Sequence, residues 1–461
     1  MEFDFSKLGF RLDEGFVRWL IEKYQPARAR EFRKLYEYYS NCRYNCSAGQ
    51  MQQAQIQGLP ERIRGSAEKG IGRKEVVIEN DIGWRINSMN DFLFGRQIRI
   101  KSLSKTRDKA RKIESLLNEV FEANGGSEFF MSLALLGSVY GFVDILLRIE
   151  GLFSENAEAR DVKLDLVPAE RALPVLEEGD AGRINCYLQN FRMEINQAGD
   201  SGIGGLSRKQ IQVTELFSPE LFQRFHDGRL VSELPCRIPE LPVVHIQNIS
   251  RPQSYEGASD VAPLIPLQDE LNTRLSDRAF RVTMQSFKLY LAKGLEDPGA
   301  KEVVPGRIWY TWNQDASIEQ FGGDSACPGE ESHIDQIRAA MDKISGVTPL
   351  AAGVLRGKIG NLSSAVALKM TLIGILSKNE RRKAAYGDGI RQLCRKLLLA
   401  LDSAGIFKTS REERKVEVVF ADPLPENTTD KLNEAILKKE AGLPEEEVFS
   451  EFGAYPKEET G

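Results

Sequence analysis

A glycine-rich loop between two helical segments constrains the fold of this chain more than any other stretch. Residues 344–371, ISGVTPLAAGVLRGKIGNLSSAVALKMT, begin as the end of one helical pattern and finish as the start of another. Ser345-Gly346 is a helix-stop signal, and Pro349 prevents simple continuation of the first helix. Three glycines then make the backbone permissive: Gly353, Gly357 and Gly360. The stretch predicts a helix, a pliable loop and a second helix.

The loop carries charge of one sign. Arg356 and Lys358 are its charged residues, and the whole stretch contains no acidic residue. Asn361 or Ser363 can cap the next helix, which we expect over residues 364–400 because they are good helix formers. A loop that is glycine-rich, apolar and basic suits sliding contact with a polyanion better than it suits fixed chemistry.

Length and charge limit the classes of function that remain open. A chain of 461 residues is too long for one ordinary core and should form about two to four substructures. The formal net charge is −5, and residues 430–461, with nine acidic and four basic side chains, account for all of it. The rest of the chain is neutral in sum. This balance excludes a protein that binds nucleic acid by bulk charge, while it allows a few local basic contacts.

The sequence predicts no metal ion, no cofactor and no nucleotide site. Cys42 and Cys46 form a CxxxC pair, but no second Cys or His pair completes a zinc site, so we expect reduced thiols and an intracellular origin. Residues 353–359, GVLRGKI, depart from a phosphate-binding P-loop, because three residues separate the glycines and Ile359 replaces the hydroxyl residue. The three histidines are scattered without metal-binding spacing: His226, His245 and His333.

No membrane span or secretion signal is expected. Residues 129–143 form the most apolar stretch, but it is interrupted by serines and glycines and is shorter than the roughly 18–20 residues a span needs. A buried helix followed by a strand fits it better. Residues 1–10 lack the basic and long apolar regions of a signal peptide.

Hydrophobic periodicity divides the first 250 residues into a helical part and a β-rich part. Amphipathic helices are predicted over residues 13–39, 75–94, 108–124 and 128–140, and a short strand over 97–100. Strands are predicted over residues 142–150, 162–167, 183–195, 209–216 and 243–247.

The second half reads as a helical hairpin with an insertion, followed by the loop and a long helix. Residues 262–288 carry a leucine stripe, and residues 330–345 carry a second apolar stripe. Between them, residues 294–329 suggest a compact α/β insertion. In the long helix, Gly374, Gly387 and Gly389 predict a kink. The basic run Arg381-Arg382-Lys383 predicts a solvated face or salt bridges between subunits, and residues 415–420 predict a final strand.

This order of parts resembles the portal proteins of tailed bacteriophages, in particular the SPP1-type portal family. The resemblance covers most of the chain. It rests on the stretches KEVVIENDIGWRINSMNDFLFG (74–95), VVHIQN followed by EGASDVAPLIPLQDELNTRLSD (243–277), ISGVTPLAAG (344–353) and NLSSAVALKM (361–370). None of these stretches is a catalytic motif. The resemblance depends on the order in which they occur along the chain.

The resemblance implies an α+β portal fold that assembles as a ring of about 12 copies. Its expected parts are a wing (1–260 and 362–420), a two-helix stem (261–288 and 330–346), a small α/β clip (289–329), a tunnel loop (347–361) and a helical crown (421–461). It implies a non-enzymatic channel for genome packaging and ejection in the virion. The implied partners are double-stranded DNA without sequence preference, the terminase large subunit, a head–tail adaptor protein and the major capsid protein.

Two sets of residues are then expected to carry function. In the tunnel loop, Arg356, Lys358 and Asn361 should face the DNA. In the stem, an apolar stripe that one hairpin leaves uncovered should pack between subunits: Leu264, Leu267, Leu271, Leu275, Ile337 and Met341. The alternative is a packaging motor (terminase) subunit or another DNA-processing enzyme. The absence of a P-loop lysine-hydroxyl pair and of an acidic metal cluster weighs against it.

Overall fold

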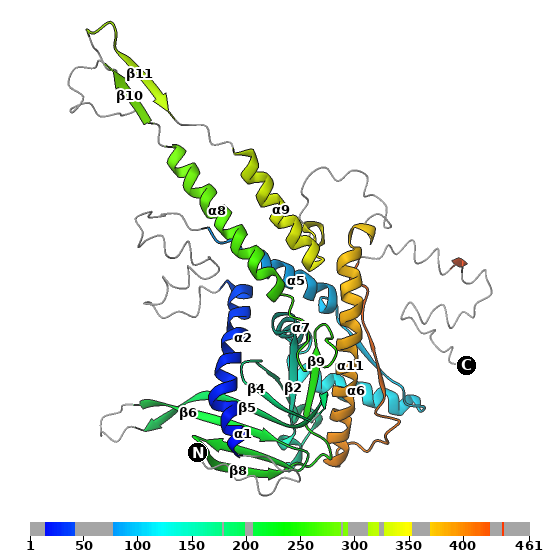
Figure 1. Ribbon diagram of the computed structural model, residues 1–461. Helices are drawn as coiled ribbons and strands as arrows, with labels where there is room; N and C mark the ends of the chain where they lie inside the picture. The colour runs from blue at the N-terminus through cyan, green and yellow to red at the C-terminus, as the bar shows by residue number, and fades with distance from the viewer. Residues whose placement is uncertain are drawn as a thin grey trace.

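The protein consists of a broad body and a long two-helix projection (Figure 1). The computed structural model describes residues 14–41, 77–177, 179–198, 206–286, 289–293, 312–321, 327–352, 369–424 and 436–437. Within these residues, no helix is both long and apolar enough to cross a membrane. The apolar stretch 129–143 instead forms a buried helix that leads into a strand, as its sequence predicted.

The elements alternate between helical and β-rich parts as the periodicity indicated. The helices are α1 (Glu14–Trp19), the π-helical turn η1 (Leu20–Tyr24), α2 (Gln25–Ser40), α5 (Asp81–Phe94), α6 (Arg107–Ala123), α7 (Ser127–Tyr140), α8 (Ile265–Ser286), α9 (Pro328–Ser345) and α11 (Ile373–Ser403), with 3-10 turns η3 (Glu150–Phe153), η4 (Ala159–Asp161), η5 (Ala262–Leu264) and η6 (Pro349–Ala352). The strands are β1 (Arg99–Ser102), β2 (Phe142–Arg148), β3 (Lys163–Val167), β4 (Ala172–Glu177), β5 (Asp180–Ala198), β6 (Leu206–Phe217), β7 (Leu221–His226), β8 (Arg229–Pro235), β9 (Val243–Gln247), β10 (Leu289–Lys293), β11 (Ser317–Phe321) and β12 (Val416–Val419).

Two larger antiparallel sheets form most of the β part of the body, beside a two-stranded sheet of β1 and β12. The strand orders of the two larger sheets are β3-β2-β9 and β4-β5-β6-β7-β8. The predicted strands correspond to β2, β3, β5, β6 and β9, whereas β4, β7 and β8 were missed. A signal for the β7–β8 hairpin was present, because Asp227-Gly228 joins the two strands with positive φ at both residues. Such a pair between apolar-alternating segments is a strong short-range hairpin signal.

Helices cover both sheets. Val17 and Ile21 of the first helical segment belong to an apolar cluster with residues of β4, β5, β6 and β7. Gln25 Nε2 donates to the carbonyls of Glu170 (3.0 Å) and Asn190 (2.7 Å), which fixes this segment on the larger sheet. The main apolar core joins α6, α7 and the C-terminal half of α11 to the three-stranded sheet.

The long helix α11 is continuous across Gly387 and Gly389, where the sequence predicted a kink, whereas Gly374 lies in its first turn, just after the turn at Leu372. These glycines permit close packing instead. A Cβ on Gly389 would lie 2.3 Å from the Cδ1 of Ile246 on β9, and one on Gly387 would lie 3.3 Å from the ring of Phe420. The helix backbone therefore rests directly on the sheet.

The prediction of a solvated face for Arg381-Arg382-Lys383 is wrong for Arg382. Its side chain is 1% exposed, whereas neighbouring Arg381 is exposed. A helix turns about 100° per residue, so consecutive arginines face different ways. Arg382 lies on the buried face with Asn379 and Tyr386, at helical spacings of three and four residues.

The guanidinium of Arg382 joins three elements of the body. Its Nε donates to Asn248 Oδ1 (3.0 Å), just after β9, and its Nη1 donates to the carbonyl of Met89 (3.2 Å) on α5. Its Nη2 donates to Asn90 Oδ1 (2.9 Å) and to Ser138 Oγ (2.7 Å) on α7. A buried charge is tolerated only when its donors are satisfied in this way.

We predict that Arg382→Met destabilises the protein by about 3 kcal/mol or more, because each buried acceptor left without a donor costs roughly 1–3 kcal/mol. The matched control is Arg381→Met, which changes an exposed side chain and should stay within about 0.5 kcal/mol of wild type. Urea unfolding followed by circular dichroism measures both. Equal effects of the two substitutions would contradict the structural role assigned to Arg382.

Candidate nucleic-acid channel segment and its stem

The predicted tunnel-loop residues Arg356, Lys358 and Asn361 lie outside the residues that the structure describes. The described chain stops at Ala352 and resumes at Lys369. What the structure defines is how the two ends of this segment are held: α9 and η6 precede it, and α11 follows it.

The two ends meet backbone to backbone. Gly346 follows α9 in the left-handed conformation, with φ of 74°, and its N–H donates to the carbonyl of Asp342 at 2.9 Å. This is the helix stop that Ser345-Gly346 predicted. A Cβ on Gly374 would lie 3.2 Å from the carbonyl oxygen of Gly346, so no side chain separates the chains there. The intervening segment therefore leaves and returns at one place.

A buried arginine, Arg85 of α5, fixes the outgoing end. Its side chain is 1% exposed, and its Nη1 donates to the carbonyl of Val347 (2.6 Å) and to Ser345 Oγ (3.2 Å). The same guanidinium pairs with Asp342 Oδ1 of α9 (2.6 Å) and with Asp81 Oδ2 one turn back on α5 (3.1 Å). One cation thus ties the base of the projection and the start of the loop segment to the body.

A lysine of α11 fixes the returning end. Lys378 Nζ donates to the carbonyl of Ser345 (3.1 Å) and pairs with the buried Asp260 Oδ1 (2.6 Å). The other oxygen of Asp260 accepts from Asn248 Nδ2 (2.7 Å), which connects this anchor to the network around Arg382. Both ends of the loop segment therefore rest on largely buried polar and charged groups.

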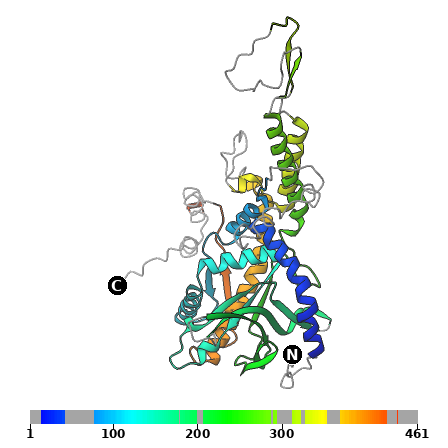
Figure 2. The same ribbon diagram turned by 90° about the vertical axis from the view of Figure 1, so that its left-hand side faces the viewer.

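The stem helices α8 and α9 pack side by side, as both views show (Figures 1 and 2). The expectation that the leucine stripe stays uncovered within one chain is wrong. Most of the stripe is buried in an apolar cluster that includes residues of α9 and α5, and Leu267 alone of the six predicted residues is half-buried. The buried stem residues are Leu264 (0% exposed), Leu271 (0%), Leu275 (5%), Ile337 (5%) and Met341 (0%).

A polar stripe on α8, which the sequence analysis missed, holds the chain that enters α5. Gln268, Asn272 and Ser276 recur every four residues and are all buried. They accept from the backbone N–H groups of Ile82 (3.3 Å), Glu79 (3.1 Å) and Val77 (3.0 Å) respectively. The recurrence of uncharged polar residues at i, i+4 and i+8 could have indicated this polar stripe from the sequence.

The stem has no excess of positive charge. Helix α8 carries three acidic and three basic side chains, and α9 carries four acidic and two basic ones. Several are paired, as in Arg274–Glu270 (2.7 Å) and Arg281–Glu330. Arg338 pairs with Glu79 of the segment before α5 (2.6 Å). A surface of this kind attracts no polyanion by itself.

The densest titratable cluster of the body is structural. Buried Asp144 accepts from the phenols of Tyr187 (2.8 Å) and Tyr255 (2.7 Å), and its Oδ1 lies 2.6 Å from Nδ1 of His245. Burial raises the pKa of both tyrosines well above the ordinary value, and the second nitrogen of His245 contacts the Tyr255 carbonyl (2.8 Å). Every group is thus engaged inside the fold. In the described part of the chain, no group of three His, Cys, Asp or Glu side chains could hold a metal ion.

Sequence reasoning missed Arg85 and Arg382 as organising residues. Both lie within an otherwise apolar helical stripe: Arg85 between Ile82 and Met89, and Arg382 between Ile375 and Ile390. An arginine on the buried face of a predicted helix was the usable signal, since a buried guanidinium needs several acceptors.

Comparison with known proteins then identifies the family. Residues 22–451 match the family described as phage portal protein, SPP1 Gp6-like. No curated protein matches the chain. One matching solved structure is the neck of an empty GTA particle computed with C6 symmetry, with 13% identity, a TM-score of 0.46, and 86% of this chain and 95% of that chain covered. Because the family match spans nearly the whole chain, this protein belongs to the SPP1 Gp6-like family of phage portal proteins, which are structural components of the phage particle and not enzymes.

Proposed function

We propose that about twelve copies of this chain close into a ring at one capsid vertex and form the channel for genome packaging and ejection. Membership of the portal family supports this proposal. The alternative of a packaging motor subunit or another DNA-processing enzyme is set aside, because the family is structural.

The parts of the chain then take separate tasks. The wing (1–260 and 362–420) contacts the major capsid protein, and the stem (261–288 and 330–346) packs against neighbouring stems. The clip (289–329), to which β10 and β11 belong, receives the terminase large subunit during packaging and a head–tail adaptor protein afterwards. The crown (421–461) faces the capsid interior. The position of β10 and β11 at the far end of the stem, away from the body, suits an external docking part (Figure 1).

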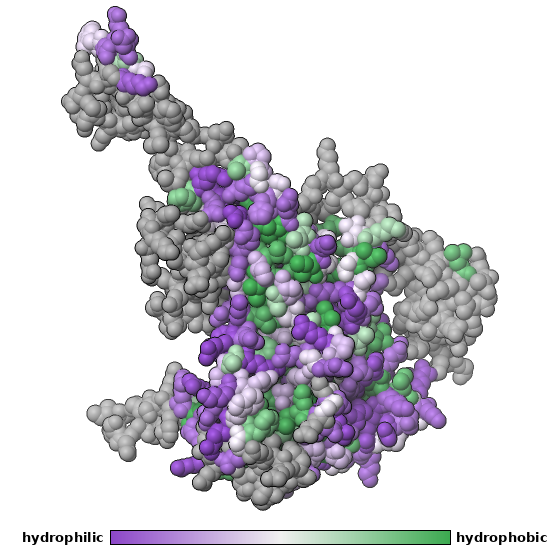
Figure 3. Space-filling view, viewed as in Figure 1, coloured by the Kyte–Doolittle hydropathy of each residue, from purple (hydrophilic) through white to green (hydrophobic). Residues whose placement is uncertain are grey.

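The stem helices supply part of the subunit contact. Leu267 is half-buried, and apolar residues gather on the face of the stem seen in Figure 3. Packing between copies would remove this surface from water, at about 25 cal/mol per Å² of apolar area. In this proposal Leu264, Leu271, Leu275, Ile337 and Met341 act indirectly, by keeping the two helices together.

The structural observation that best supports the proposal is that both ends of the loop segment are held in place. Arg85 and Lys378 hold its two ends at the foot of the stem, with Gly346 and Gly374 in contact. In a ring, every copy would present the same segment at the same height. Arg356, Lys358 and Asn361 would then meet the DNA backbone, which is the same for every base sequence.

Weak contact is what such a channel needs. Each phosphate neutralised by a basic side chain releases counterions and tightens binding, so a strongly basic wall would hold the DNA in place. The charges of α8 balance, and α9 is acidic in sum. Two cations per loop give about 24 in a ring of about twelve, supplied by symmetry on an otherwise neutral wall.

We predict that the purified protein forms closed rings. About twelve chains of 51.8 kDa give a particle of about 620 kDa. Native mass spectrometry with negative-stain class averages measures both the mass and the hole. A protein that stays monomeric across micromolar concentrations would contradict the proposed ring.

We predict that Arg356→Ala combined with Lys358→Ala leaves the ring intact but changes DNA packaging or retention, because the wall loses its cationic contacts. Packaged DNA per particle measures this. The first control is Arg356→Lys with Lys358→Arg, which keeps the charge and should behave as wild type. The second is Arg381→Ala, which removes an exposed cation of α11. Wild-type packaging by the double alanine variant would show that neither residue contributes to DNA packaging or retention.

A further inference from the structure

The central hairpin of the larger sheet extends beyond the rest of that sheet. Strand β5 has 19 residues and pairs with β6 along the whole of β6, from Leu206 to Phe217. However, β4 pairs with β5 only as far as Gln189, and β7 pairs with β6 only from Val213. Residues 193–198 and 206–211 therefore form a two-stranded ribbon, here called the β5–β6 ribbon, which projects from the body (Figure 1).

The projecting ribbon leaves two strand edges open. It continues two inner strands of the five-stranded sheet, and among the described strands neither of its outer edges has a neighbour. Its base carries the exposed side chains of Arg192, Met193 and Glu194. Unpaired strand edges are templates for pairing with another strand.

The same sheet ends in an edge that is suited to accept a strand. In the described chain, β8 pairs with β7 alone, and three of its apolar side chains are exposed: Leu230 (43%), Val231 (56%) and Leu234 (43%). The opposite edge strand, β4, is protected. It has Pro174 in its middle, and the Ala172 carbonyl accepts from Arg28 Nη1 of α2 (3.2 Å). The β8 edge has a proline only at its last residue, Pro235, although a bulge at Val231 interrupts its pairing with β7.

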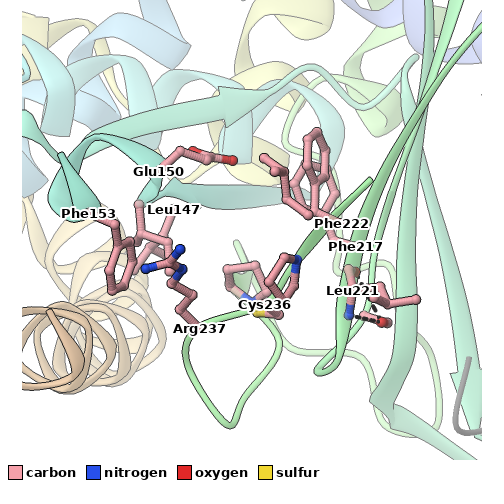
Figure 4. A pocket seen from close by; sticks show the side chains of 13 residues that line it. Leu147, Glu150, Phe153, Phe217, Leu221, Phe222, Cys236 and Arg237 are labelled. Atoms are coloured by element: carbon pink, nitrogen blue, oxygen red, sulfur yellow. Dashed lines mark hydrogen bonds between the residues drawn. The ribbon is translucent and has the colours of Figure 1, made fainter. Parts of the chain in front are cut away.

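An apolar pocket of about 220 Å³ opens beside the end of β8 (Figure 4). Leu234 lines it together with Phe217 and Phe222, whose rings stack at 4.8 Å. Phe153 lies across the pocket, with the guanidinium of Arg237 over its ring at 4.6 Å. A strand added to β8 would place alternate side chains on the pocket side.

We propose that the β5–β6 ribbon of one copy pairs with the β8 edge of the next copy through main-chain hydrogen bonds. This contact deepens the proposed function, since it rests on the ring assembly of this chain. The donor and the acceptor are different surfaces of one chain, so the contact is heterologous. Repeated around an axis, a heterologous contact closes a ring.

Two variants remove one surface each. The donor variant replaces residues 194–210 with Asn-Gly, which joins Met193 and Ile211, residues that already face each other across the ribbon, by a two-residue hairpin turn. The acceptor variant is Val231→Asp on β8. Its matched control is Leu103→Asp, which places the same charge on a side chain of equal exposure, 56%, outside the larger sheet.

Sedimentation velocity and native mass spectrometry measure assembly, and far-ultraviolet circular dichroism checks that each variant folds. We expect both variants to fold and to self-associate about tenfold or more weakly than wild type, because the edge contact is lost, while Leu103→Asp forms wild-type rings. Wild-type rings from either folded variant would overturn the inference. Loss of rings in Leu103→Asp as well would also overturn it, because the effect would not be specific to β8.

Mixing the two variants tests whether these two surfaces meet. The donor variant keeps an intact β8 edge, and Val231→Asp keeps an intact ribbon, so one functional contact remains per pair. We expect a 1:1 heterodimer that forms more tightly than either variant self-associates, because the stem contacts are the same in every pair and only the mixed pair has a ribbon facing an intact β8 edge. Absence of the heterodimer would overturn the pairing of ribbon with β8. If wild-type protein forms no ring at all, the proposed function fails, whereas wild-type rings with unaffected variants refute this inference alone.

Discussion

The buried guanidinium of Arg85 is the contact on which the arrangement of the molecule most depends. It binds Asp342 at the end of α9 and the Val347 carbonyl directly after it, while it stays paired with Asp81 on its own helix. Burial of a cation is costly unless its donors are used, so this site tolerates little displacement. The stem and the outgoing end of the loop segment are therefore held to the body in one geometry.

A second buried arginine extends this constraint through the body. Arg382 connects α11 to α5, to α7 and to Asn248, the residue after β9. Asn248 in turn donates to Asp260, which pairs with Lys378. The returning end of the loop segment is fixed by that chain of contacts. The two arginines thus position both ends of the segment that we propose contacts DNA.

Much of the fold could be predicted from periodicity, and the exceptions have physical causes. The stop at Ser345-Gly346 and the strand-rich region after Phe142 followed from helix caps and from period-two alternation. Strand β4 was missed because it contains Pro174, which argues against a strand in a sequence. Arg382 was misjudged because a charge run suggests solvent, and its acceptors Asn90, Ser138 and Asn248 lie far away in sequence. Burial of the leucine stripe could not be foreseen either, since its cluster includes residues of α5, which lie more than 170 residues away in the sequence. For the candidate site, the loop residues were predicted from the sequence, and the structure shows only the contacts that hold the two ends of the loop segment.

The central claim is that the foot of the stem faces a common axis and presents residues 353–361 to the lumen. A cryo-electron microscopy map of the purified assembly, refined with its own symmetry, tests this most directly. The account predicts that Gly346 and Gly374 lie on the inner side of the ring, with density for the segment between them projecting into the channel. A map with this pair on the outer rim, or with no central channel, would contradict it.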